Sequence, residues 1–223
     1  GLKILVSLVR FQFWPLPFPS MKDSHQILTY RFSSLASTND WSKCNAETFP
    51  DQSLVCTAAD AQTAGRGQYG KSWLSSPGTN LLVTYSFLSD LILDEMGLLA
   101  PSVGRLVIDW IKSLDIATTP LLKWPNDLMI DNKKVAGILC ETTPHEKGVR
   151  LHIGMGINVN ASQSEMNAIT QPATSLRLVS GRIFDRNLLL NSLTNFLFRE
   201  LTNPNGIFRW RFSKRLAPPS NFE

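Results

Sequence analysis

Residues 121–160 read LLKWPNDLMIDNKKVAGILCETTPHEKGVRLHIGMGINVN. Short apolar runs alternate in this stretch with Pro, Asn, Asp and Gly, the residues that favour turns. We expect a tight hairpin turn at Asp131-Asn132-Lys133, and strands at 121–124, 128–130, 135–140 and 151–159. Because a short turn joins antiparallel neighbours, the stretch predicts a sheet in which antiparallel pairing dominates.

The flanking sequence adds three more strands and several helices. Strands are expected at 27–32, 53–58 and 81–88, and the polar cluster Ser37-Thr38-Asn39-Asp40 is typical of a helix start near Trp41. Apolar residues recur at helical spacing over 95–114 and after Asp185, which is placed to cap a last helix. The last helix should bury Leu188, Leu189, Ser192, Leu193, Phe196, Leu197 and Leu201. The fold class is therefore α+β, a mixed, largely antiparallel sheet with helices packed on one face.

Length and composition indicate one globular domain. The chain has 223 residues, and we expect the domain at 27–202, with a leader of unknown role at 1–26 and a tail at 203–223. The net charge is +4, but Lys and Arg are scattered, which argues against a nucleic-acid partner. Three cysteines without ligand spacing are typical of free thiols in the cytoplasm, and the apolar run near the N-terminus is too short to cross a membrane.

A glycine-rich motif, Gly65-Arg66-Gly67-Gln68-Tyr69-Gly70, lies in a loop between two expected strands. Its spacing matches a dinucleotide-binding loop, but the sequence that follows cannot open the long helix such a loop requires, and no kinase motifs follow. Glycines bring backbone N–H groups close to an anion, and Arg66 and Lys71 add positive charge. The loop suits a phosphate or carboxylate, and a solvated surface turn is the alternative.

Three further motifs carry polar groups at the ends of expected strands. Lys123-Trp124-Pro125-Asn126-Asp127 places an amide and a carboxylate at a proline corner, although such a sequence also forms ordinary turns. In Lys133-Lys134-Val135-Ala136-Gly137 the second lysine can reach a phosphoryl oxygen, while the first is expected to be solvated. Gly137 leaves room for a ligand or another backbone. Gly154-Met155-Gly156-Ile157-Asn158 predicts either a ligand-binding strand or a bulged core strand.

Taken in order, Ser37-Thr38-Asn39, the Gln62–Gly70 segment with Trp73, and these three motifs resemble the signature set of biotin–protein ligases. The resemblance covers most of the chain, roughly residues 27–200. It implies a catalytic domain related to class II aminoacyl-tRNA synthetases. The implied reaction is ATP-dependent activation of biotin to biotinyl-5'-AMP, with Mg²⁺ as a cofactor, and transfer of biotin to a lysine of the biotin carboxyl carrier domain of a carboxylase.

The resemblance also implies the residues of the site. Lys134 and Arg66 would be catalytic. We assign no general base, and Asp127 is a candidate only. Biotin would contact Ser37, Thr38, Asn39, Gln62, Arg66, Gly67, Gln68, Lys134, Gly137, Gly154 and Gly156. The nucleotide would contact Arg66, Gln68, Trp73, Asn126, Lys134 and Asn158. The metal ligands are not indicated.

The sequence departs from the family pattern at the glycine-rich loop. Tyr69 stands where many members carry a second arginine, so the loop has one fixed cation fewer. We expect no helix-turn-helix domain before the motifs, and we expect the small β-barrel that often follows them to be absent or truncated. The chain is compatible with a monomer or a homodimer. Two alternatives remain: a lipoate or octanoate ligase or transferase of the same superfamily, and a non-catalytic biotin-binding sensor.

Overall fold

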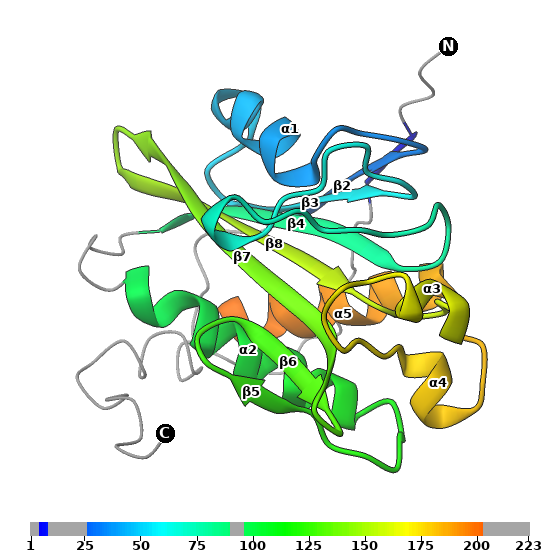
Figure 1. Cartoon of the computed structure of the whole chain (residues 1–223). Coiled ribbons are helices and arrows are strands. Elements are labelled where there is room, and N and C mark those ends of the chain that lie inside the picture. The colour runs from blue at the N-terminus through cyan, green and yellow to red at the C-terminus, as the bar shows by residue number, and fades with distance from the viewer. Residues whose placement is uncertain (1–4, 9–25, 90–95, 203–223) are drawn as a thin grey trace.

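The computed structural model describes residues 5–8, 26–89 and 96–202. These residues form one sheet with the strand order β1-β2-β3-β4-β8-β7-β6-β5 (Figure 1). Only β2 and β3 pair in parallel, and every other neighbouring pair is antiparallel. The strands are β1 (Leu5–Leu8), β2 (Gln26–Phe32), β3 (Ser53–Ala59), β4 (Leu81–Ser89), β5 (Leu121–Lys123), β6 (Asp127–Ile130), β7 (Lys133–His145) and β8 (Gly148–Ile157).

The sheet agrees with the predicted hairpins. Asp131 and Asn132 adopt positive φ angles of 50° and 60° between β6 and β7, the conformation that a two-residue hairpin turn requires. Residues 5–8 of the expected leader pair with β2, and Gln26, its last residue, begins β2. Residues 1–4 and 9–25 of the leader and the 203–223 tail lie outside the described residues.

Helices pack on both faces of the sheet, not on one face as we expected. The helices are α1 (Thr38–Cys44), α2 (Met96–Lys112), α3 (Gln163–Asn167), α4 (Leu176–Ser180) and α5 (Arg186–Thr202), with two short 3₁₀ segments, η1 (Ala46–Thr48) and η2 (Gln68–Gly70). Figure 1 shows α2 and α5 on one face and α1 on the other. Alternate residues of β4 explain this division, because Val83 and Tyr85 join the apolar core with α2 and α5, whereas Thr84 bonds to α1. The second face is therefore polar enough to hold a site.

Helix α5 begins where it was predicted, but its buried face is rotated. Oδ1 of Asp185 accepts hydrogen bonds from the backbone N–H groups of residues 187 and 188, which caps the helix. Leu188 is 67% exposed, whereas Leu190, absent from the predicted face, is buried. Ser192 is also exposed, although its Oγ accepts a hydrogen bond from Trp110 Nε1. At about 100° per residue, Leu188 lies about 140° around the helix from the buried Leu193, which takes it out of the interface.

Helices α3 and α4 were not predicted, and they bring the 171–174 segment against β7. A capping box at Ser162 starts α3, and Ser175 caps α4. Between them, Ala173 forms an isolated bridge with Lys134, so the start of β7 gains a neighbour on each side. No helix among the described residues is long and apolar enough to cross a membrane.

Candidate functional site

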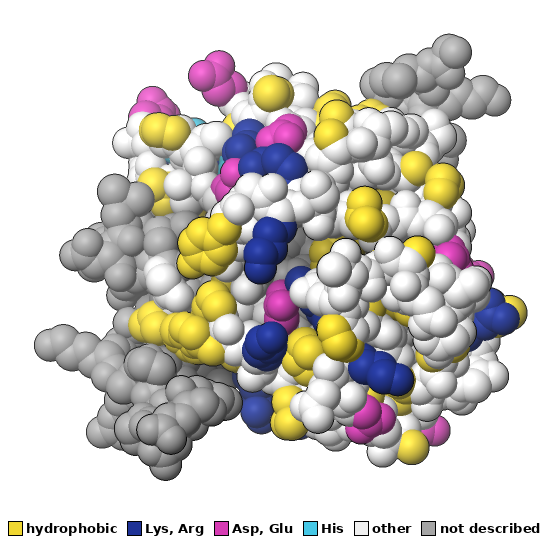
Figure 2. All heavy atoms as spheres, in the orientation of Figure 1, with side chains coloured by type: hydrophobic (Ala, Val, Ile, Leu, Met, Phe, Trp, Pro, Cys, Tyr) yellow, Lys and Arg dark blue, Asp and Glu magenta, His cyan; other side chains and the backbone are white. Residues whose placement is uncertain are grey.

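A cavity of about 680 Å³ opens on the face of the sheet that carries α1. Its floor is formed by β7 and β8, and its walls by the start of α1, the glycine-rich loop, the 123–127 corner and the 169–173 segment. Figure 2 shows basic side chains around this hollow with acidic ones among them. All the residues predicted to contact biotin or nucleotide line it: Ser37, Thr38, Asn39, Gln62, Arg66, Gly67, Gln68, Trp73, Asn126, Lys134, Gly137, Gly154, Gly156 and Asn158.

One end of the cavity is a set of linked polar side chains. Oε1 of Gln62 accepts hydrogen bonds from the backbone N–H of Thr38 (2.8 Å) and from its hydroxyl (3.0 Å). The Thr84 hydroxyl lies 2.8 Å from that hydroxyl and 2.6 Å from Oδ1 of Asn39. Gly154 makes this possible, because a Cβ there would lie 2.3 Å from Oδ1 of Asn39. The end of the cavity is thus rich in both donors and acceptors.

The indole of Trp73 covers two glycines in the floor. Gly137 and Gly156 are paired across β7 and β8, and a Cβ would lie 2.9 Å from the indole at Gly137 and 2.2 Å from it at Gly156. The space predicted beside Gly137 therefore holds the Trp73 ring. Nε1 of Trp73 is buried and has no hydrogen-bond partner in the described part of the chain.

Lys134 forms a close ion pair at the other end of the cavity. Its Nζ lies 2.7 Å from Oδ1 of Asp127, and the two side chains are only 14% and 21% exposed. The same Nζ lies 5.3 Å from the centre of the Trp73 ring. Lys133 is exposed, as predicted. Backbone hydrogen bonds to Pro172 and Thr174 fix the strand around Lys134, so a partly desolvated ammonium group is held facing the cavity.

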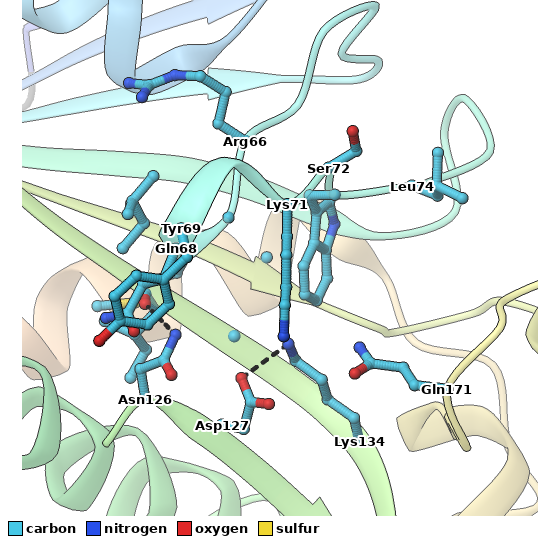
Figure 3. A pocket seen from close by; sticks show the side chains of 18 of the residues that line it. Arg66, Gln68, Tyr69, Lys71, Ser72, Leu74, Asn126, Asp127, Lys134 and Gln171 are labelled. Atoms are coloured by element: carbon cyan, nitrogen blue, oxygen red, sulfur yellow. Dashed lines mark hydrogen bonds and ion pairs between the residues drawn. The ribbon is translucent and has the colours of Figure 1, made fainter. Parts of the chain in front are cut away.

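Arg66 lines the same cavity, but its guanidinium is directed away from Lys134 (Figure 3). It makes two hydrogen bonds to Asp40, at 2.7 and 3.0 Å, and one to Glu141 at 2.6 Å. Burial lowers the pKa of Arg66, but Glu141 and Asp40 raise it above its ordinary value. The two predicted catalytic cations therefore share a cavity, but their charged groups do not converge on one point.

The two asparagines predicted to contact the nucleotide also hold the backbone. Nδ2 of Asn126 donates to the backbone carbonyl of Ile138 at 2.9 Å. The backbone carbonyl of Asn126 accepts a hydrogen bond from the backbone N–H of Ile138. Asn158 is 2% exposed, and its Nδ2 donates to the carbonyls of Lys134 and Thr174. These bonds fix the proline corner and the Lys134 strand, and nucleotide contact stays a prediction for both side chains.

Sequence reasoning overlooked Glu141, Lys43 and Thr84, and it assigned Asp40 only to the helix start. A signal for Glu141 was available, because residues 137, 139 and 141 of a strand face the same side. On α1, Asp40 directly follows the cavity residue Asn39, and Lys43 lies about one turn further along. Only their pairing with Glu141 and Arg66 shows what they do. The described residues contain no cluster of three or more His, Cys, Asp or Glu able to hold a metal ion.

Residues 30–160 match the model of the Biotin/lipoate A/B protein ligase family. The chain belongs to this family. A relative in the biotin/lipoate ligase family, the bifunctional ligase/repressor BirA of Bacillus spizizenii, is 36% identical over 139 residues, which are 61% of this chain and 42% of that protein. The biotin–[acetyl-CoA-carboxylase] ligase of Mycobacterium tuberculosis is 31% identical over 179 residues, 78% of this chain and 62% of that one. The chain thus spans about two fifths of BirA and less than two thirds of the mycobacterial enzyme.

Solved structures of biotin protein ligases share the fold. The Aquifex aeolicus enzyme in complex with biotin and ATP superposes with a TM-score of 0.62 at 27% identity, over 80% of this chain and 73% of that one. The Leishmania major enzyme with biotin gives a TM-score of 0.66 over 88% and 85% of the two chains, and at 23% identity it bears on the fold alone. The predicted α+β class, that of the biotin ligases and class II synthetases, is confirmed.

Proposed function

We propose that this chain activates biotin with ATP, forming biotinyl-5'-AMP, and transfers the biotinyl group to a lysine of a biotin carboxyl carrier domain. The observation that carries this proposal is one cavity with a polar pocket at one end and the desolvated Lys134–Asp127 pair at the other. Family membership supports it. We also propose a cytoplasmic location, since Cys44, Cys56 and Cys140 are all free thiols, as is usual in a reducing compartment.

The polar end suits the head group of biotin. A ureido group presents two N–H donors and one carbonyl acceptor in a plane, and Thr38, Asn39 and Gln62 offer hydroxyl, amide and carbonyl groups that match them. The dithiolane ring of lipoate has no N–H donor and no carbonyl acceptor, so it would gain no hydrogen bonds from these groups and would lie against a polar surface. The pocket therefore favours biotin over lipoate or octanoate.

The acid of biotin would then lie over Trp73 and near Lys134. Its carboxylate oxygen attacks the α-phosphorus of ATP, the bond from that phosphorus to the bridging oxygen breaks, and pyrophosphate leaves. Lys134 stabilises the negative charge that develops at phosphorus, and Asp127 orients the ammonium group. Mg²⁺ is expected to arrive on the ATP phosphates and to neutralise part of their charge, since it binds mainly to phosphates and one or two carboxylates.

The second step needs an acceptor amine and a leaving group. The carrier lysine, as a neutral amine, attacks the carbonyl carbon of the mixed anhydride. The single bond from that carbon to the phosphate oxygen of AMP breaks, and AMP leaves with the electron pair. Asp127 remains the candidate to take the amine proton. The glycine-rich loop lies over the cavity, and its closure would keep water from hydrolysing the anhydride.

The proposed reaction is tested by ATP–pyrophosphate exchange with biotin, lipoate and octanoate in turn. We expect exchange with biotin, and with a purified carrier domain we expect a gain in its mass equal to one biotinyl group. Exchange with lipoate and not biotin would assign the chain to the lipoate branch of its family. Biotin binding without exchange would make it a sensor.

A further inference from the structure

The carboxylate of Glu141 connects the polar pocket to the glycine-rich loop. Its Oε2 accepts hydrogen bonds from Nδ2 of Asn39 at 2.8 Å and from Arg66 at 2.6 Å. Its Oε1 accepts one from Nζ of Lys43 at 2.7 Å. Asn39 and Arg66 are 27 positions apart in the chain and 102 and 75 positions from Glu141, so only this carboxylate brings their donors to one atom.

These bonds continue into the pocket. Oδ1 of Asn39 accepts a hydrogen bond from the Thr84 hydroxyl. The Thr84 hydroxyl also lies within hydrogen-bond distance of the Thr38 hydroxyl. The Thr38 hydroxyl donates to Oε1 of Gln62. Asn39 is 3% exposed, and its Nδ2 also contacts the backbone carbonyl of residue 139 at 3.3 Å. The NH₂ of this buried amide is directed toward Glu141, and its oxygen is directed toward Thr84 and Gly154. In the opposite orientation the oxygen would face the Glu141 carboxylate, which donates no hydrogen bond.

An ionised carboxylate is well suited to this position because it accepts hydrogen bonds and donates none. Burial raises the pKa of Glu141, but hydrogen bonds from Lys43, Asn39 and Arg66 lower it below its ordinary value. Glu141 is thus charged at neutral pH. Its side chain is 22% exposed, so its bonds to charged donors are only partly screened.

We propose that Glu141 is a positioning residue, which orients the Asn39 amide for the head group of biotin and anchors Arg66 of the glycine-rich loop. This inference rests on the proposed function for the identity of the ligand. Glu141 does not touch biotin in this arrangement. It acts through Asn39, whose oxygen it keeps directed toward Thr84 at the polar end of the cavity, and through Arg66, whose guanidinium it holds near α1.

Glu141→Gln tests the inference, because the amide keeps the shape but has one accepting oxygen. If the oxygen of the glutamine faces Asn39 and Arg66, the glutamine NH₂ faces the ammonium of Lys43, and neither of these two groups can accept a hydrogen bond. In the opposite orientation its NH₂ meets the donors of Asn39 and Arg66. We expect biotin to bind about tenfold more weakly by calorimetry, because a hydrogen bond that orients the Asn39 amide is lost. Glu146→Gln, which neutralises a carboxylate 78% exposed on the same hairpin, should stay within about twofold of wild type.

A second variant separates positioning from a general loss of structure. Adding Lys43→Met to Glu141→Gln removes the ammonium that opposes the Gln NH₂, so the Gln oxygen can face Asn39. Biotin affinity should recover to within about threefold of wild type. A merely structural role for the carboxylate predicts that the double variant is worse than the single one, and that result would overturn the inference.

The experiments distinguish a failure of this inference from a failure of the proposed function. If wild type binds biotin and Glu141→Gln binds it equally well, positioning by Glu141 is wrong and the function stands. If wild type binds no biotin, the proposed function fails, and the anchoring of Arg66 is then judged by tryptic cleavage after Arg66 in the ligand-free protein. Cleavage at least about threefold faster in Glu141→Gln than in Glu146→Gln supports the anchor, and equal rates refute it.

Discussion

Gly156→Ala should disrupt the floor of the cavity through a single neighbour. A Cβ at residue 156 would lie 2.2, 2.5 and 2.7 Å from three atoms of the Trp73 indole, whereas carbon atoms pack at about 3.5–4.0 Å. The ring must therefore retreat by more than about 1 Å. Overpacking of this kind costs about 1–3 kcal/mol, and the reduced entropy of the unfolded chain returns up to about 1 kcal/mol.

Urea unfolding followed by circular dichroism measures this effect as a lower free energy of unfolding, by about 1–2 kcal/mol. The matched control is Gly97→Ala on α2, where a Cβ meets nothing within 4 Å and a helical alanine should raise stability by about 0.5–1 kcal/mol. Trp73→Ala should remove most of the cost of Gly156→Ala. If Gly156→Ala costs the same with and without the indole, Trp73 does not lie on the glycine floor and our account of the cavity is wrong.

Three further predictions address the ion pair, a buried histidine and a helix cap. Lys134→Met should slow biotin-dependent pyrophosphate exchange by at least about 100-fold, while Lys133→Met, on an exposed side chain, should change it by less than about threefold; equal effects would remove Lys134 from the reaction. Burial and the charge of Arg150 lower the pKa of His152 to about 4 from 6.5, so the unfolded chain takes up the proton first as the pH falls. The stability that the neutral ring contributes, on the order of 3 kcal/mol, should be full above pH 6.5 and decline toward about pH 4, and urea midpoints in His152→Gln should lack this slope. Asp185→Ala should lower the free energy of unfolding by about 1 kcal/mol through loss of the α5 cap, and an unchanged urea midpoint would contradict that role.

The strands and their turns could be predicted because their signals are local. Asp131 and Asn132 favour the left-handed turn, and the alternation around them gives the strands on each side. The helix starts at Ser37 and Asp185 were predicted for the same reason, since a cap bonds to backbone groups two or three residues away. Much of the cavity lining was also predicted, but from the resemblance of the motifs to a family and not from spacing, and the 169–173 wall was missed.

The sequence by itself determined where most strands and the helices α1, α2 and α5 lie, because those choices depend on residues close together in the chain, whereas β1, α3 and α4 were missed. Only the tertiary structure decided on which face α1 packs, where the Trp73 ring lies, and that Arg66 pairs with Asp40 and Glu141. The Arg66–Glu141 pair joins residues 75 positions apart. A guanidinium bonds to the carboxylates that the folded sheet and helix bring near it. A local sequence pattern does not predict which residues, far apart in the chain, will lie within hydrogen-bond distance.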